Sequence, residues 1–220
     1  MLERTRRSPT KSERRVLNGA LAFRRKQLRL SFRRGLIACA VIFGGLCAWT
    51  LAASNAPRWI VLTFWSAIAI PMSIWAHVST RRELSAGLKA LEDAVARDEA
   101  DIVRIQSSAM VEFEEIEDEG ACYAFQVEDR LIVFVDGQEF YPSAKFPNTD
   151  FSLVHLHDAR GKLVEMLIAK HGDKAQPVRT IPAATKSKLA VPDHLATIEG
   201  RLEDLETLLA TSAPRVASHA

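Results

Sequence analysis

Two histidines separated by a single residue are the pattern in this sequence that comes nearest to a chemical site. In "HLHD", His155 and His157 would point to one face of a strand, about 6.6 Å apart, because each strand residue adds about 3.3 Å. Imidazoles can bind zinc, but a tetrahedral site needs further ligands. No recognised spacing is formed by the remaining candidates, which are Cys122, Glu165, His171 and Asp173. We expect both histidines to be half-exposed on the solvent side of a sheet, with no metal or other cofactor.

Sequence motifs of catalysis are missing from the chain. It contains no His-Glu-x-x-His, no paired Cys-x-x-Cys, no nucleophile elbow, and no Walker, Rossmann or kinase signature. The three cysteines form no disulfide framework, and Cys122 stands alone outside the apolar segments. We therefore name no catalytic residue. A hydrolase that uses Cys122 or the His155/His157 pair is kept as an alternative.

The loop "GQEFYPSAKFPNTDF" gathers aromatic and proline residues between two expected strands. Long connections without secondary structure are uncommon in compact domains and often functional. Aromatic side chains beside prolines could form a groove for a protein partner, or they could plug the open end of the sheet. The residues proposed for partner binding are Phe140, Tyr141, Phe146 and Phe151.

The acidic stretch "EFEEIEDE" covers residues 112–119. Its carboxylates lack the spacing of a calcium loop, and alternate strand residues point to opposite faces. We expect a solvated strand end, with contact to the basic N-terminal segment as a second hypothesis.

The elements that would position these residues form a small α+β domain. Alternation in "ACYAFQVED" sends Ala121, Tyr123, Phe125 and Val127 to one face, and the apolar run "RLIVFVDG" follows after a short turn. Residues 151–157 and 162–170 predict a second hairpin, and residues 109–116 a further strand. Short connections favour an antiparallel β-meander or roll. Apolar stripes at 83–100 and 193–210 predict flanking helices, which we expect to dock on the sheet, with self-association as the alternative. The first of them could also continue the second apolar stretch as a stalk.

Two apolar stretches precede this domain. Residues 35–56 and 59–80 each hold 22 residues without Asp, Glu, Lys or Arg, and about 20 suffice to cross a bilayer as a helix. A removable signal peptide is disfavoured, because a 34-residue basic segment precedes the first stretch and a second stretch follows at once. The sequence therefore predicts a transmembrane hairpin of two spans.

The distribution of positive charge predicts the orientation of this hairpin. Residues 1–34 carry twelve Lys or Arg, Arg81 and Arg82 follow the second span, and only Arg58 lies between the spans. The positive-inside rule puts both termini in the cytoplasm. A bacterial inner (plasma) membrane is our default location.

The basic segment could also bind the membrane surface. Anionic headgroups attract juxtamembrane Lys and Arg, whereas the motifs of nucleic-acid readers are absent, so membrane lipids are the expected partner and nucleic acid is not. The simpler interpretation is that the basic segment only sets the membrane topology. The candidates for lipid-surface binding are Arg24, Arg25, Lys26, Arg29, Arg33 and Arg34.

Small residues recur at every fourth position of the first span. Ala40, Gly44 and Ala48 would let another helix approach closely. We expect this transmembrane packing stripe to join the two spans of one chain, with a homo-oligomer as the alternative.

Taken together, these patterns divide the chain into eight segments. They are a basic cytoplasmic arm (1–34), two transmembrane helices (35–56 and 59–80), a juxtamembrane helix (81–100), a β-rich cytoplasmic domain (101–181), a linker (182–192), an amphipathic helix (193–210) and a disordered tail (211–220). We expect a membrane-anchored interaction or regulatory module with a protein partner. The alternatives are a membrane-tethered hydrolase and a small accessory subunit of a larger membrane complex.

Overall fold

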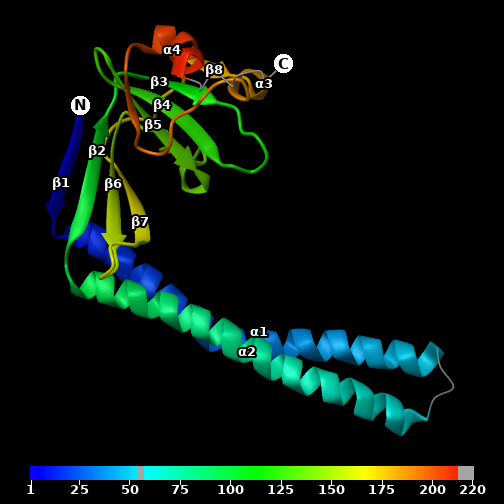
Figure 1. Cartoon of the computed structure of the whole chain (residues 1–220). Helices are drawn as coiled ribbons and strands as arrows, with labels where there is room; N and C mark the ends of the chain where they lie inside the picture. Colours follow the sequence, from blue (N-terminus) through cyan, green and yellow to red (C-terminus); the bar gives the residue numbers. More distant parts are fainter. Residues whose placement is uncertain (54–56, 213–220) are drawn as a thin grey trace. The chain divides into compact units, whose positions relative to one another are not determined.

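The computed structural model describes residues 1–53 and 57–212 (Figure 1). The predicted tail from 213 onward and the last three residues of the first predicted span lie outside the described residues. In chain order the elements are β1 (Leu2–Arg7), α1 (Lys11–Ala53), α2 (Arg58–Ala96), β2 (Ala100–Gln106), β3 (Ala109–Phe113), β4 (Ala121–Glu128), β5 (Leu131–Gly137), the short helix η1 (Gln138–Phe140), β6 (Asp150–His157), β7 (Leu163–Lys170), β8 (Arg179–Ile181), α3 (Ala183–Lys186), β9 (Thr197–Glu199), η2 (Leu202–Asp204) and α4 (Leu205–Ser212).

The chain divides into two compact units. We call residues 1–7, 101–155 and 166 onward the sheet unit, and residues 8–100 and 156–165 the hairpin unit. The second unit holds both long helices and the tip of the β6–β7 hairpin.

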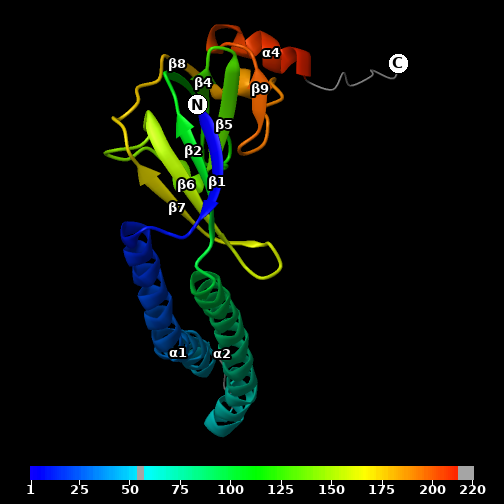
Figure 2. The ribbon, with the colours of Figure 1, turned by 90° about the vertical axis from the view of Figure 1, so that its left-hand side faces the viewer.

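The sheet unit contains one four-stranded and one five-stranded sheet. The strand orders are β1-β2-β6-β7 and β8-β3-β4-β5-β9, and Figure 2 shows β1, β2, β6 and β7 side by side in one layer. Strands β3, β4 and β5 form the predicted antiparallel meander, with Phe125 opposite Val133. The α+β class with antiparallel strands is therefore confirmed, although β8 pairs with β3 in parallel.

Two apolar cores lie on opposite faces of the five-stranded sheet. The predicted alternation in β4 holds, because Tyr123 and Phe125 belong to one core whereas Cys122 and Ala124 belong to the other. The first core also takes residues from β2 and β6, so it lies between the two sheets. The second core is closed by Leu205 and Leu209 of α4. A central strand with both faces buried explains why β4 is almost wholly apolar.

The C-terminal helix is shorter than the sequence predicts. In place of one helix over 193–210, residues 197–199 form strand β9 and the helix begins only at Leu205. Ile198 pairs with Ile132 on β5, so the edge of the sheet satisfies backbone groups that a helix would have satisfied internally. Gly200 has φ +151°, a conformation that interrupts a helix. The expected docking of this apolar stripe on the sheet is correct.

The predicted linker 182–192 also carries structure. It contains the helical turn α3, and Lys186 in that turn is buried and forms an ion pair with Glu119. Burial of a lysine with a carboxylate partner ties this segment to the acidic stretch of the same unit.

In the hairpin unit, α1 and α2 run side by side as an antiparallel pair (Figures 1 and 2). Both are long and apolar enough to cross a membrane, by length and composition. The protein itself buries 0% of the most apolar window of α1 and 6% of that of α2, so it leaves both windows uncovered. The two predicted apolar helices are therefore present, and each continues well beyond its apolar stretch.

The basic arm is not a separate segment. Residues 2–7 form the edge strand β1 of the four-stranded sheet, whereas residues 11–34 are the first turns of α1. Thr10 and Glu13 explain why the helix begins there: the Glu13 carboxylate accepts the Thr10 backbone N–H (2.6 Å), and the Thr10 hydroxyl accepts the Glu13 N–H (3.3 Å). This reciprocal pair is a capping box.

The predicted juxtamembrane helix 81–100 is the last part of α2, which ends at Ala96, whereas Ala100 already begins β2. Its apolar stripe packs against α1, whereas we expected it to pack on the sheet. Leu91 on α2 and Leu17 and Leu21 on α1 are buried where the helices run together. Arg14 pairs with Asp98 (2.8 Å) and Arg25 with Glu92 (2.7 Å) along the same seam. The seam of apolar side chains flanked by ion pairs is typical of two amphipathic helices in contact.

Candidate interhelical binding site

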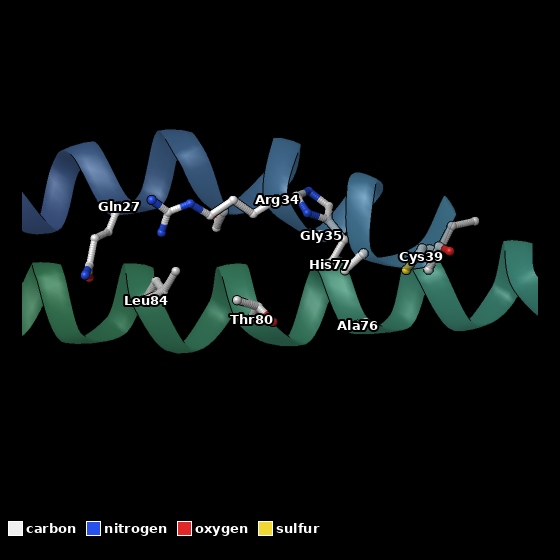
Figure 3. A pocket seen from close by; sticks show the side chains of 12 residues that line it. Gln27, Arg34, Gly35, Cys39, Ala76, His77, Thr80 and Leu84 are labelled. Carbon is white, nitrogen blue, oxygen red and sulfur yellow. The ribbon is translucent and has the colours of Figure 1, made fainter. Parts of the chain in front are cut away.

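A pocket of about 550 Å³ lies between α1 and α2, where the basic turns of α1 meet its apolar stretch. Figure 3 shows Arg34 and His77 between the two helices, with Gln27 and Leu84 toward one end and Cys39 toward the other. The lining residues are Gln27, Ser31, Arg34, Gly35, Ala38 and Cys39 of α1, and Ser73, Ile74, Ala76, His77, Thr80 and Leu84 of α2.

Helical spacing explains how these residues meet. On α1, Gln27, Ser31 and Arg34 follow one another at intervals of four and three, so they share one face. On α2, Ser73, His77, Thr80 and Leu84 do the same. An antiparallel pair of helices brings these two faces together over several turns.

On α1, the polar residues of the pocket, Gln27, Ser31 and Arg34, come before the small residues Gly35 and Ala38. The Arg34 guanidinium carries five donors in a planar fork, and the hydroxyls of Ser31 and Thr80 add further hydrogen-bonding groups. Gly35, Ala38 and Ile74 supply the apolar part of the lining. Such a lining suits an amphiphilic ligand with an anionic polar group.

The electrostatics around the pocket are positive. None of its lining residues is Asp or Glu. Two of the six predicted lipid-surface residues are already paired: Arg24 with Glu165 (2.6 Å) and Arg25 with Glu92. The other four, all exposed, are Lys26, Arg29, Arg33 and Arg34.

Outside this pocket, the contact between the apolar stretches depends on larger side chains than predicted. The Trp65 indole N–H donates to the Thr50 hydroxyl (3.1 Å), and Phe43 lies 6.4 Å from the Trp65 ring. The residues of the predicted small stripe, Ala40, Gly44 and Ala48, are exposed. They therefore do not form the packing between the two helices of the chain, which corrects that expectation.

The two histidines proposed as metal-site candidates lie in different surroundings. His155 lies on the same face of β6 as the core residues Phe151 and Leu153. The prediction that it lies on the solvent side of the sheet is therefore wrong. His155 lines a pocket of the sheet unit together with His194. His157 belongs to the hairpin unit, where its carbonyl accepts a hydrogen bond from Arg97. Within the described residues, no three His, Cys, Asp or Glu side chains are grouped to hold a metal.

Cys122, the thiol of the hydrolase alternative, is buried in the second core. Burial raises its pKa to about 12, because the thiolate would lose its hydration. A thiol with this pKa stays protonated near neutral pH and is a poor nucleophile.

The aromatic loop is mostly core. Phe140, Phe146 and Phe151 are buried in contact with the first core, and the Phe146 ring lies 5.4 Å from that of Phe151. These rings fill the open end of the sheet, which was the alternative to a partner-binding groove. Because they are buried, they cannot line an exposed groove. Tyr141 is exposed, and its hydroxyl donates to Glu115.

Three carboxylates of the acidic stretch bind groups of their own unit. Glu114 accepts the backbone N–H of Ala183 (2.9 Å), Glu115 accepts that of Gly120 (3.0 Å), and Glu119 pairs with Lys186. These carboxylates fix a turn and the helical turn α3, so they are more than a solvated strand end.

Comparisons with known protein families, curated proteins and solved structures found no match to this chain. The class that fold and site define is a helical hairpin, long and apolar enough to cross a membrane, joined to an α+β sheet unit.

Sequence reasoning foresaw Arg34 but missed most of the pocket. Gln27, Ser31, His77 and Thr80 line it, and none of them was among the predicted site residues. The available signal was the repetition of polar side chains at intervals of three and four on both helices, close to the ends of the apolar stretches.

Proposed function

We propose that this chain is a membrane-anchored interaction or regulatory module, with its α+β sheet unit at the cytoplasmic face of a bacterial inner membrane. The observation that carries the proposal is a contrast in burial. The apolar windows of α1 and α2 are left uncovered by the protein, whereas the sheet unit completes two cores from its own residues. Uncovered apolar helices are stable in lipid, because their backbone groups are satisfied internally.

The orientation rests on charge. The basic turns of α1 precede its apolar stretch, and Arg81 and Arg82 follow that of α2, so positive charge gathers at one end of both stretches. The positive-inside rule puts this end, and both termini, in the cytoplasm.

Binding is favoured over hydrolysis for the sheet unit. The thiol proposed as a nucleophile is buried, and its raised pKa of about 12 keeps it protonated near neutral pH. Tyr141 is the residue of the predicted partner-binding loop that remains accessible.

Thiol labelling tests the anchoring and orientation. In a full-length chain with Cys39→Ser and Cys47→Ser, Ser54→Cys introduces a thiol near the end of the first apolar stretch, next to the connection to the second, and Ala159→Cys introduces one at the β6–β7 turn. An impermeant maleimide should label the first variant in intact bacterial cells and the second only after lysis. The reverse pattern would overturn the orientation, and release of the chain by alkaline carbonate would overturn the anchoring.

Photo-crosslinking tests the interaction role. A photo-crosslinkable residue at Tyr141 in the inserted full-length chain should give one adduct protein, which then binds the purified chain and loses binding with Tyr141→Ala. Val178 is the control position, because it is exposed at 64%. Equal crosslinking at both positions, or unchanged binding by Tyr141→Ala, would remove this loop from the proposed function.

A further inference from the structure

We propose that the interhelical pocket binds the headgroup of an anionic glycerophospholipid, with Arg34 as the main ligand of its phosphate. This inference rests on the proposed membrane anchoring and gives it a defined lipid partner.

The position of the pocket along the helices fits a lipid headgroup. Gln27, Ser31 and Arg34 precede the apolar stretch of α1, and the pocket then continues along Ala38 and Cys39 inside it. With a helical rise of 1.5 Å per residue, the lining of α1 extends for about 18 Å along its axis. That length passes from the headgroup layer of a bilayer into its hydrocarbon region.

The chemistry of the lining changes in the same direction. A phosphate would meet the Arg34 guanidinium, whose fork matches two phosphate oxygens, and the Thr80 hydroxyl can donate to a further oxygen of the headgroup. The Ser31 hydroxyl donates to the Leu28 carbonyl (2.8 Å), so it offers the headgroup an acceptor only. An acyl chain would lie against the apolar lining of Ala38, Ile74 and Ala76. Soluble phosphate would use only the polar part of the pocket.

Charge complementarity selects an anionic lipid over a zwitterionic one. No carboxylate lines the pocket, and Lys26, Arg29 and Arg33 are close to Arg34 along the same helix. Arg24 and Arg25 are held by Glu165 and Glu92, which leaves Arg34 as the arginine of the pocket.

Native mass spectrometry of the delipidated full-length protein tests this site. Phosphatidylglycerol should bind at least about tenfold more tightly than phosphatidylcholine, as one retained lipid per chain, and Arg34→Gln should reduce that affinity by about tenfold. Arg33→Gln is the matched control, because it removes the same charge from the adjacent residue, which does not line the pocket. It should change the affinity by less than about twofold. Thr80→Val, nearly unchanged in shape, should weaken binding without disturbing the helices.

Three results would overturn the assignment. Equal losses in the Arg33 and Arg34 variants would mean a diffuse basic surface, and no preference between the two lipids would mean that charge does not select the ligand. Full displacement of the lipid by millimolar inorganic phosphate would mean a site for free phosphate. The thiol-labelling experiment, repeated on each variant, separates the lipid site from the membrane anchoring. A hairpin that inserts but shows no lipid preference contradicts the lipid site alone. A hairpin that fails to insert contradicts the anchoring.

Discussion

Cys122 lies on β4 opposite Phe113 of β3 and Asp136 of β5. The side chain is 3% exposed, so reagents reach the thiol only when the sheet unit opens. From the sequence it was a solitary thiol that could have served as a nucleophile. In the fold it is a small apolar core residue.

Labelling of Cys122 should therefore be blocked in the native protein. In the full-length chain with Cys39→Ser and Cys47→Ser, a maleimide at pH 8 should leave Cys122 unmodified, and denaturant should make it react completely. The pKa of about 12 reinforces this protection, because little thiolate forms at that pH. Val178→Cys in a Cys122→Ala background is the exposed control. Native labelling of Cys122 as fast as that of the control would contradict its burial.

Asp150 accepts hydrogen bonds from two side chains of the sheet unit. Hydrogen bonds from Arg104 (2.7 Å) and Gln106 (3.0 Å) lower its pKa to about 2. The usual pKa of an unfolded Asp is about 3.9, so this group stabilises the fold above about pH 4 and loses that effect as the pH falls to about 2.

Asp150→Asn should remove this part of the pH dependence. We expect it to lower the free energy of unfolding near pH 7 by about 1 to 2 kcal/mol, a range that allows for partial solvent exposure. Between pH 4 and 2 the melting temperature of the wild type should fall more than that of the variant. Calorimetry of the full-length protein in detergent at pH 7, 4 and 2.5 measures both effects. Parallel losses in the two proteins would show that Asp150 does not titrate as described.

At the scale of the elements, the start of β4 depends on a close backbone approach. Gly120 has φ +95°, and a Cβ there would lie 2.4 Å from the carbonyl carbon of Gly137, at the end of β5. Gly161, in the turn between β6 and β7, has φ +77°, but nothing lies within 4 Å of an added Cβ. The two glycines share an unusual φ and differ in the space around them.

Gly120→Ala should therefore destabilise the protein more than Gly161→Ala. The positive φ alone costs about 1 to 2 kcal/mol, which is the whole effect expected for Gly161. The clash with backbone atoms should bring the cost at Gly120 to about 3 kcal/mol or more. Thermal unfolding of the two full-length variants in detergent compares them directly. Similar melting temperatures would show that the backbone around Gly137 moves aside at little cost.

At the scale of the whole molecule, charge is divided between segments. Residues 1–34 carry a net charge of +10, although the whole chain carries only +2. Part of this positive charge is matched locally, by Asp101 for Arg6 in the sheet unit and by Asp98, Glu92 and Glu165 in the hairpin unit. Lys26, Arg29, Arg33 and Arg34, next to the apolar stretch of α1, are all exposed. The binding of anionic lipid proposed for that region should therefore weaken with salt.

The sequence by itself determined the features that depend on local pattern. Two uncharged runs of 22 residues predict the apolar helices, and the alternation through Tyr123 and Phe125 predicts the central strand and its hairpin with β5. Each of these signals lies within one segment, and neighbouring residues alone decide it.

Only the tertiary structure decided which partner each remaining segment takes. Residues 2–7 and 197–199 become edge strands because β2 and β5 offer unpaired backbone groups, and the Phe140 and Phe146 rings are buried because the two sheets leave room between them. The pocket likewise needs α1 and α2 in one register, so that Arg34 and His77 line the same space. Such choices depend on residues far apart in the chain, and no local periodicity records them.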